Sequence, residues 1–428
     1  MSISPLLPVY NRAEPVFTHG EGAWIVADDG RRFLDCVAGI ATNALGHAHP
    51  RLVDALTRQA GKLWHVSNVF RVPGQEELAQ KLTAATFADT VFFANSGTEA
   101  IECALKMARK YHAAKGHPDR IDIIGFAGSF HGRSYAAVNA SGNAAYLGGF
   151  GPRLPGYVQL SVDDMPALLA AIAAPATAAV IVEPVQGEGG ARALSGEWLQ
   201  TVRRACTDAG VLLIHDEVQS GMGRTGKLFA HQWFDDAAPD IMAMAKALGG
   251  GFPVGACAAT EEAASGMTAG AHGSTFGGNP LAMAVGTEAF DLINAPGFLD
   301  QTVAAAARLR AGLEEVAARH PELVVDVRGK GMLIGVKLTG NNREFMAMAR
   351  EKLLLVAGGG DNCVRLLPPL NLSEAEADEA VARFAATLEL AGEGRAKQGA
   401  PSPVRRGRAA ACRRAGGPPP PPPPPAPE

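Results

Sequence analysis

Short apolar runs of strand length alternate with helical stretches along the first part of this chain. The apolar runs cover residues 91–94, 121–124, 179–182 and 211–214. Amphipathic helical patterns cover residues 51–85 and 98–114. Parallel neighbours in a sheet need long crossover connections, and helices supply them. The alternation therefore predicts an α/β fold with a mostly parallel central sheet and helices on both faces.

Polar residues follow three of these apolar runs. Asn95-Ser-Gly-Thr98 follows the first run, Glu183 follows the third, and Asp216 lies two residues beyond the fourth. In parallel sheets, ligands bind beyond the carboxyl ends of the strands. We therefore expect these side chains to converge on one site.

The pattern changes after Pro296. A long helix is expected over residues 300–319, then short strands at 323–327 and 332–338, and a final helix from Ser373 to about Leu390. This succession predicts a smaller α+β domain at the C-terminal end. The expected organisation has four parts: an N-terminal segment (1–50) that packs with the small domain, a large cofactor-binding domain (51–295), the small domain (296–392) and a tail (393–428).

The tail differs in composition from the rest of the chain. It contains eight consecutive prolines at 418–425 and, from Arg395 on, seven basic residues against one acidic residue. Such a segment cannot bury a core, so we expect residues 393–428 to be disordered or extended. Because the net charge of the whole chain is −4, the remainder carries about −10. A body of that charge offers no basic face to nucleic acid.

The sequence indicates neither export nor a membrane span. Its N-terminus lacks a basic segment followed by an apolar one, and no window reaches the roughly 18 apolar residues of a membrane helix. Six scattered cysteines without any Cys-x-x-Cys indicate neither a zinc site nor a disulfide framework. His47 and His49 have no neighbouring carboxylate or cysteine in the sequence that would complete a metal site. We expect a cytoplasmic protein without a metal site.

Lys246 lies in an apolar run that ends in three glycines, thirty residues after Asp216 at a strand end. Poorly solvating neighbours favour the neutral amine, which is the form that attacks an aldehyde. An acid at the end of a buried strand can keep a pyridine nitrogen protonated, so that the ring accepts electrons. The pair indicates pyridoxal phosphate held on Lys246 as a Schiff base. Taken alone, however, a lysine flanked by alanines more often belongs to a solvated helix.

Ser96-Gly-Thr-Glu99 stands between the first strand and the helix that follows it. The pattern is typical of a capping box, with Ser96 as N-cap and Glu99 reaching back. The N–H groups of Gly97 and Thr98, the Thr98 hydroxyl and the helix dipole would together form an anion pocket. The motif therefore favours a phosphate site here, although it is also common as a plain helix cap.

A glycine-rich segment supplies a rival hypothesis, a nucleotide-binding enzyme. Gly221-Met-Gly-Arg-Thr-Gly226 matches G-x-G-x-x-G and, with Lys227, nearly matches a P-loop. A P-loop needs Ser or Thr after the lysine, and position 228 is Leu. A dinucleotide loop should join strand and helix directly, but Asp216-Glu-Val-Gln-Ser220 intervenes, with Asp216 at the strand end. The context therefore disfavours nucleotide binding.

Six motifs together resemble those of the class III pyridoxal-phosphate aminotransferases, a family of fold type I. They are Phe92-Phe-Ala-Asn-Ser-Gly-Thr-Glu-Ala100, Ser129-Phe-His-Gly-Arg133, Glu183-Pro-Val-Gln-Gly-Glu-Gly-Gly190, Asp216-Glu-Val-Gln-Ser-Gly-Met-Gly-Arg-Thr-Gly226, Ala245-Lys-Ala-Leu-Gly-Gly-Gly-Phe-Pro253 and His272-Gly-Ser-Thr-Phe-Gly-Gly-Asn-Pro280. The likeness extends from about residue 8 to residue 390, with the motifs in the family's order. It leaves the tail outside.

The resemblance implies a homodimer with shared active sites and a role for each matching residue. Lys246 would form the Schiff base and carry the proton, and Asp216 would pair with the pyridine nitrogen. The other implied cofactor contacts are Gly97 and Thr98 at the phosphate, Phe130 on the ring face, Gln219 near the ring's 3-oxygen, and Thr275 from the other subunit.

The resemblance also implies two carboxylate sites. Arg133, assisted by Ser274, would bind the distal carboxylate of the substrate, because a guanidinium grips a carboxylate with two bonds. Arg365 would bind the α-carboxylate of glutamate, and Glu188 would mask this arginine while an ω-amino substrate is bound. Without the motifs, a surface salt-bridge partner would be the favoured interpretation of either arginine.

The implied reaction is a two-stage transamination. N2-acetylornithine would give up its amino group and leave N-acetylglutamate 5-semialdehyde, and 2-oxoglutarate would leave as glutamate, as in arginine biosynthesis. N-succinyl-diaminopimelate, ornithine and 4-aminobutyrate are alternative donors within the family. Outside it, a non-catalytic binding protein is a further alternative, although such a protein would be expected to have lost the lysine.

One departure from the family pattern lies beside the expected site. His215 replaces an apolar residue immediately before Asp216. We expect its ring to have satisfied hydrogen bonds and to be a structural neighbour rather than a catalyst, although its titration could alter the surroundings of Asp216.

Overall fold

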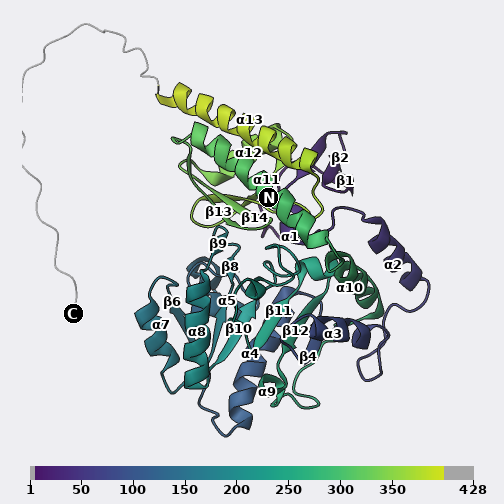
Figure 1. Ribbon diagram of the computed structural model, residues 1–428, viewed down its shortest axis with the longest axis vertical. Helices are drawn as coiled ribbons and strands as arrows, with labels where there is room; N and C mark the ends of the chain where they lie inside the picture. The colour runs from purple at the N-terminus through teal and green to yellow at the C-terminus, as the bar shows by residue number, and fades with distance from the viewer. Residues whose placement is uncertain (1–4, 400–428) are drawn as a thin grey trace, which may run out of the picture.

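A seven-stranded sheet forms the centre of the larger lobe in the computed structural model, which describes residues 5–399 (Figure 1). In sheet order its strands are β4 (Thr90–Ala94), β12 (Gly255–Ala259), β11 (Ile241–Met244), β10 (Leu212–Asp216), β7 (Thr177–Val182), β5 (Asp122–Phe126) and β6 (Tyr157–Leu160). Only the pairings of β12 are antiparallel. The four apolar runs expected to be strands are β4, β5, β7 and β10, and the predicted α/β fold is confirmed.

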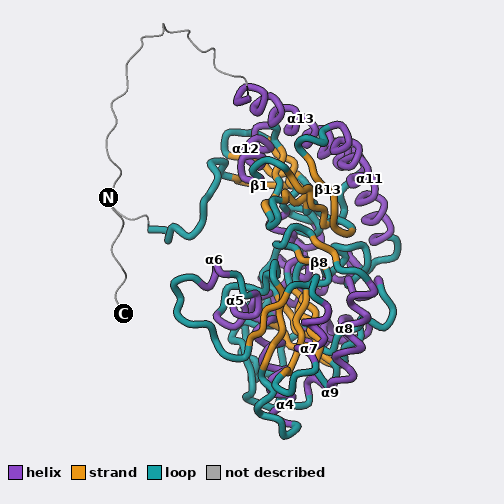
Figure 2. Tube along the Cα trace, turned by 90° about the vertical axis from the view of Figure 1, so that its left-hand side faces the viewer, coloured by secondary structure: helices purple, strands orange, loops and turns teal. Residues whose placement is uncertain are grey.

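Helices cover both faces of this sheet, and α5 and α8 lie on opposite sides of its strands in Figure 2. One face carries α4 (Gly97–Ala114), α5 (Tyr135–Ser141) and α9 (Glu261–Ala264), and the other carries α7 (Met165–Ile172) and α8 (Gly196–Ala209). Neighbouring residues of a strand point to opposite faces. Leu212 accordingly packs in the cluster with α4, whereas Leu213 packs in the cluster with α8.

The stretch 51–85, expected to be helical throughout, is two helices separated by a loop. They are α2 (Pro50–Ala60) and α3 (Gln75–Ala84). Gly61 ends the first helix, and Pro73-Gly74 precedes the second, with Gly74 in a left-handed conformation (φ 85°) that favours glycine. The remaining elements of this lobe are α1 (Ala38–Ala41), α6 (Ala144–Leu147), α10 (Pro280–Ile293), the 3₁₀ helices η1 (Ala230–Trp233) and η2 (Lys246–Gly249), and the hairpin strands β8 (Val185–Gln186) and β9 (Arg192–Ala193).

The C-terminal lobe is an antiparallel sheet covered by helices, as expected. Its strands, in sheet order, are β13 (Val324–Lys330), β14 (Leu333–Leu338), β17 (Cys363–Leu366) and β16 (Ala357–Gly358). Its helices are α11 (Phe298–Arg319), α12 (Asn342–Glu351) and α13 (Glu374–Gly399). The last helix continues beyond its expected end at Leu390, because residues 393–399 are mostly good helix formers. The rest of the expected disordered tail lies outside the described residues.

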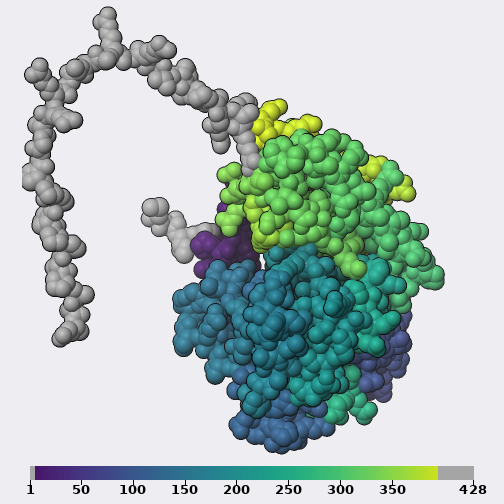
Figure 3. Space-filling view, turned by 60° about the vertical axis from the view of Figure 1, so that its left-hand side comes forward, coloured from purple at the N-terminus to yellow at the C-terminus, as the bar shows by residue number. Residues whose placement is uncertain are grey.

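The N-terminal residues join the C-terminal lobe through a second sheet. This sheet contains β1 (Phe17–Glu21), β2 (Trp24–Ala27), β3 (Arg32–Asp35) and β15 (Leu354–Leu355), and β3 pairs with β15 in parallel. Figure 3 shows the green C-terminal lobe on the blue and teal lobe, with purple N-terminal residues at their junction.

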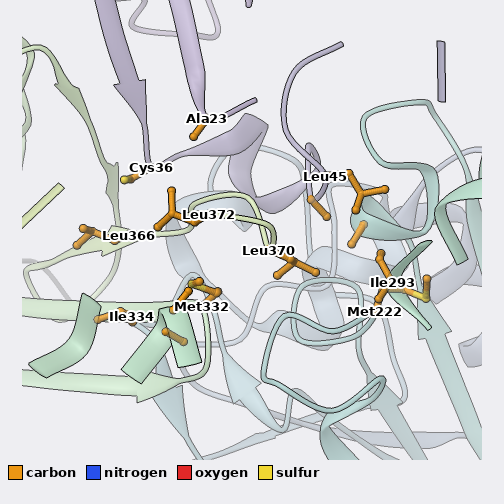
Figure 4. Packing of buried hydrophobic residues seen from close by; sticks show 14 of the residues in the cluster. Ala23, Cys36, Leu45, Met222, Ile293, Met332, Ile334, Leu366, Leu370 and Leu372 are labelled. Atoms are coloured by element: carbon orange, nitrogen blue, oxygen red, sulfur yellow. The ribbon is translucent and has the colours of Figure 1, made fainter. Parts of the chain in front are cut away.

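One apolar cluster connects the two lobes. Figure 4 shows Leu370 and Leu372 between Cys36 of the N-terminal segment and Ile293 of α10. Leu370 and Ile293 are at most 1% exposed. The junction beside the central sheet is therefore a packed core rather than a loose hinge.

In residues 5–399, no helix is long and apolar enough to cross a membrane.

Candidate active site

A cavity of about 320 Å³ lies beyond the carboxyl ends of β4, β10 and β11. This is the edge of the sheet at which the sequence placed a site. Its lining includes six of the expected cofactor contacts, namely Gly97, Thr98, Phe130, Asp216, Gln219 and Lys246, together with Glu188. Residues from distant parts of the chain thus meet beyond the carboxyl ends of the strands, where the sequence analysis expected a site.

Lys246 is the first residue of η2, and only Ala245 separates it from the end of β11. Its φ of 44° is left-handed, a costly conformation for a residue with a side chain that is found chiefly where function requires it. The pKa of Lys246 is lowered to about 8, chiefly by burial and also by the positive charge of Arg365, against the opposing charges of Glu188 and Asp216. The amine is thus far more often neutral near physiological pH than that of a solvated lysine. Lys246 is therefore not a residue of a solvated helix.

Asp216 ends β10 and is held by a histidine. Its Oδ2 lies 2.7 Å from Nδ1 of His131, and its Oδ1 accepts a hydrogen bond from the Val218 N–H at 3.0 Å. Burial lowers the pKa of His131, but the hydrogen bond and the charge of Asp216 outweigh it, so the pKa is raised overall. His131 thus gives the carboxyl group of Asp216, which is 3% exposed, a buried hydrogen-bond partner.

Glu183 places a second carboxyl group beside this pair. It accepts hydrogen bonds from the N–H groups of Phe130 (2.8 Å) and Gly187 (2.9 Å). Burial and the charge of Asp216 raise the pKa of Glu183 to about 7, against the opposing charge of His131. The carboxyl group fixes the backbone of Phe130, whose ring lines the cavity.

The start of α4 has the cap that the sequence predicts. Ser96 is the N-cap, and its Oγ accepts a hydrogen bond from the Glu99 N–H at 3.3 Å, as predicted. Glu99 reaches back to the Asn95 N–H at 2.8 Å. The N–H groups of Gly97 and Thr98 belong to the first helical turn, where the helix itself offers no acceptor. A Cβ at position 97 would lie 2.7 Å from Cγ1 of Val218, so only glycine keeps this pocket open.

Glu188 and Arg365 form an ion pair at the rim of the cavity. Glu188 lies in the loop between β8 and β9, and Arg365 lies in β17 of the other lobe. Glu188 Oε1 is 2.7 Å from Arg365 Nη2, and the arginine side chain is only 1% exposed. Arg365 also donates to Gln219 Oε1 at 3.1 Å and to the Gly358 carbonyl. The structure brings these predicted residues together, and Arg365 is not a surface salt-bridge partner.

Arg133 lies outside this cavity, in a second one of about 570 Å³. Phe130 lines both cavities, so they adjoin at its ring. The guanidinium carbon of Arg133 lies 3.8 Å from the centre of the Tyr146 ring. This contact orients the guanidinium without neutralising its charge, which leaves it free for an anion.

Ser274 and Thr275 do not line either cavity in the described part of the chain. Ser274 Oγ accepts hydrogen bonds from the Gly277 N–H (2.9 Å) and from Asn95 Nδ2 (3.2 Å), and it shows no bond to Arg133. Thr275 is exposed on the same loop. A single subunit therefore does not bring these two expected contacts to its own site.

Sequence reasoning did not assign roles to His131, Glu183 or Val218. His131 lies within the motif Ser129-Phe-His-Gly-Arg133, and Glu183 lies at a strand end. The position of each residue in the sequence therefore indicated that it is near the site. What each touches depends on the packing of three strands, which a single sequence does not show. Val218 carries no polar group, and only its contact distance to position 97 reveals it.

The surroundings of His215 differ from the expectation. His215 was expected to have satisfied hydrogen bonds, but both of its ring nitrogens are buried without a partner among residues 5–399. The expectation was wrong because the neighbouring strand β11 places apolar Met242 opposite it.

The glycine-rich segment 221–226 is buried along its whole length, so its backbone is not accessible to a nucleotide phosphate.

Comparison with known proteins gives one consistent picture. Residues 9–388 match the family model described as aminotransferase class-III. Acetylornithine aminotransferase 2 of Caulobacter vibrioides is 63% identical over 386 residues, which cover 90% of this chain and 95% of that protein. The chain belongs to the class III aminotransferases.

Solved structures of this family share the fold. The N-acetylornithine aminotransferase of Stenotrophomonas maltophilia K279a superposes with a TM-score of 0.79 at 37% identity, covering 90% of this chain and 98% of that one. An ornithine aminotransferase of Toxoplasma gondii, with partial occupancy of PLP at its active site, gives a TM-score of 0.86 at 31% identity, covering 91% and 93%.

The cofactor of class III aminotransferases is pyridoxal phosphate, and the residues of this site fit it. The N-terminus of a helix, the aromatic residue Phe130, a buried carboxyl group and a lysine with a lowered pKa surround one cavity. These groups match the phosphate, the ring, the ring nitrogen and the aldehyde of the cofactor.

Proposed function

We propose that this chain transfers the terminal amino group of N2-acetylornithine to 2-oxoglutarate in the cytoplasm. The products would be N-acetylglutamate 5-semialdehyde and glutamate, a step of arginine biosynthesis. The relatives from Caulobacter and Stenotrophomonas support this substrate. The observation that carries the proposal is the Glu188–Arg365 pair at the rim of the cavity, because it suits a site that must handle two kinds of substrate.

Pyridoxal phosphate, when bound, supplies an aldehyde for amine exchange and a ring that withdraws electrons from the substrate carbon. Gly97 and Thr98 would hold its phosphate through backbone N–H groups. Asp216, oriented by His131, would pair with the ring nitrogen. Phe130 would pack against the ring.

Lys246 binds the cofactor and then moves the proton. Its pKa of about 8 leaves a useful fraction of neutral amine, which can accept a proton from the substrate carbon and return it at a neighbouring atom. The left-handed backbone at this residue and the short helix η2 fix the amine at the end of β11. Gln219, which lines the same cavity and accepts a hydrogen bond from Arg365, would hold the ring's 3-oxygen.

Glu188 and Arg365 act as a switch between substrates. The terminal amine of acetylornithine has no carboxylate next to its reacting carbon, so Arg365 would be left as an unpaired buried charge. Glu188 neutralises it at 2.7 Å. When glutamate or 2-oxoglutarate binds, its α-carboxylate takes the place of Glu188, which is 31% exposed and therefore free to swing out.

Arg133 binds the other end of the substrate. Its guanidinium stays charged and faces the second cavity, where it can grip a carboxylate with two bonds. Tyr135, Tyr146 and Phe150 line the same cavity, whose volume of about 570 Å³ leaves room for an N-acyl group. This room favours an acylated donor over 4-aminobutyrate and free ornithine, and it also suits the bulkier N-succinyl-diaminopimelate.

We further propose that the protein is a homodimer with shared active sites. Trp64, Val69, Phe70 and Phe276 are between 58% and 80% exposed. Their two loops are joined, because Asn68 Nδ2 donates to the carbonyl groups of Ser274 and Gly277 at 3.0 Å. An exposed apolar patch of this kind marks an interface, and Ser274 and Thr275 on its edge would reach the site of the other subunit.

The dimer is tested by Phe70→Asp, which places a charge in the apolar patch. We expect sedimentation to give a monomer and transamination to be lost, since each site would lack Thr275. Val325→Asp is the control, because Val325 is 57% exposed on β13 of the other lobe. A variant Phe70→Asp that remains an active dimer would contradict the interface.

The role of Lys246 is tested by Lys246→Ala. We expect the variant to fold and to lose transamination of N2-acetylornithine by at least about 1,000-fold, because neither cofactor linkage nor proton transfer remains. Lys110→Ala, at an exposed position of α4, should keep full activity. Near wild-type turnover by Lys246→Ala would remove Lys246 from the mechanism.

A further inference from the structure

Three metal-ligating side chains meet on the side of β10 opposite the candidate active site. His215 is the fourth residue of this strand, and Glu217 follows its last residue, Asp216. His231 comes from η1, sixteen residues along the chain from His215. One ligand atom from each of these residues lies within 4.8 Å of the other two. Because side chains alternate along a strand, His215 and Glu217 point away from the cavity that Asp216 lines.

The buried ring of His215 has no hydrogen-bond partner in the described part of the chain. Its side chain is 0% exposed, and neither Nδ1 nor Nε2 has a hydrogen bond within residues 5–399. A buried polar group without a partner is unfavourable, so native proteins normally satisfy it with protein, water or an ion. An imidazole binds a metal through a ring nitrogen that carries no proton.

Glu217 and His231 already have the separation of two ligands of one ion. Oε1 of Glu217 lies 3.2 Å from Nδ1 of His231, and both side chains are buried. Ligands about 2.0–2.2 Å from a tetrahedral ion are about 3.3–3.6 Å apart. The backbone N–H groups of Ala230 (2.7 Å) and His231 (3.0 Å), and the Ser220 hydroxyl (3.1 Å), orient the Glu217 carboxylate. Such outer contacts are typical of carboxylates that bind metals.

We propose that His215, Glu217 and His231 bind a divalent cation of the zinc class. Two imidazole nitrogens and one carboxylate oxygen suit zinc, whereas magnesium and calcium prefer oxygen ligands alone. The ion would replace the hydrogen bond between His231 Nδ1 and Glu217 Oε1, with His231 protonated at Nε2. The aromatic rings of Phe87 and Phe229, 5.5 and 6.1 Å from that of His231, enclose the site.

The site is structural and separate from the proposed transamination. It ties the end of β10 to η1 and so supports Asp216 from behind. Its three residues do not line the catalytic cavity. The competing occupant of the same space is a bound water, which would also satisfy His215.

The test is the zinc content of the cofactor-loaded enzyme. The protein is incubated with zinc chloride, desalted and measured by atomic mass spectrometry. We expect about one zinc per chain for the wild type and for His320→Ala, a histidine outside the cluster, and a loss of at least tenfold for His215→Phe. Equal zinc content in the wild type and His215→Phe, whether none or adventitious surface binding, would overturn the site in favour of water.

A second variant and a second signal keep the test decisive. His231→Gln removes a different ligand and must also lower the zinc content, even if His215→Phe does not fold. Cobalt substitution adds a spectroscopic signature, because a site with two imidazoles and a carboxylate gives visible bands in the wild type that His231→Gln should lack. Retention of both the zinc and these bands by His231→Gln would refute the assignment.

Discussion

Removing the carboxylate of Glu188 should shift the preference of the enzyme between its two substrates. In the structure Arg365 makes three hydrogen bonds apart from this ion pair, two to the Gly358 carbonyl and one to Gln219. Glu188→Ala therefore removes the charge partner but leaves the guanidinium in place. An exposed ion pair contributes about 0–1 kcal/mol of free energy, whereas breaking a buried ion pair costs about 3–5 kcal/mol. The partly buried Glu188–Arg365 pair lies between these two limits. Glu188 is 31% exposed, so we take about 2 kcal/mol, or roughly thirtyfold in an equilibrium constant.

The assay compares single-turnover half-reactions. Glutamate should react with Glu188→Ala about as well as with the wild type or better, because its α-carboxylate no longer competes with Glu188. N2-acetylornithine should lose about thirtyfold in kcat/KM, because its reaction leaves Arg365 unpaired. Glu379→Ala, which breaks an ion pair with Arg383 on α13, is the matched control. Equal losses for both substrates, or none for either, would refute the switch.

Two further predictions concern cofactor binding. Gly97→Ala should weaken the affinity for pyridoxal phosphate about tenfold, because its Cβ would lie 2.7 Å from Val218 Cγ1, and Gly61→Ala, with nothing nearer than 3.9 Å, is the control in a fluorescence titration. Unchanged affinity in Gly97→Ala would contradict the anion pocket. The rate of cofactor uptake by cofactor-free enzyme should rise with pH and level off above about pH 8, because the neutral fraction of Lys246 saturates above its lowered pKa. A rate that keeps rising to near pH 10.5, the usual pKa of a lysine, would contradict the buried environment of Lys246.

The central sheet could be predicted because each strand carries its own signal. Val91 to Ala94 and Val211 to Ile214 are short apolar runs between helical patterns, and both lie within observed strands or next to their ends. The carboxyl ends of parallel strands meet at one edge, so the joint location of Thr98 and Asp216 followed from strand order alone.

The break between α2 and α3 was harder to predict. Apolar periodicity continues across residues 61–74, but Pro73 disfavours helix before it and Gly74 takes a left-handed conformation. Tertiary packing decides which of these local signals prevails.

Contacts between distant residues account for what the sequence did not show. The Glu188–Arg365 pair was implied only by family resemblance, since 177 positions separate the two residues. His131 and Glu183 surround Asp216 because three strands place them there. His215 and His231 are sixteen positions apart without a recognisable metal spacing, and only the fold makes them neighbours.

The most direct test of the proposed function is the amine specificity of the first half-reaction. The purified enzyme loaded with pyridoxal phosphate is mixed separately with N2-acetylornithine, ornithine and 4-aminobutyrate, and the visible absorbance of the bound cofactor is followed with time. We predict rapid loss of that absorbance with N2-acetylornithine and much slower loss with the other two amines. Faster conversion by ornithine or 4-aminobutyrate would contradict the proposed substrate, and the absence of a cofactor band would contradict the site itself.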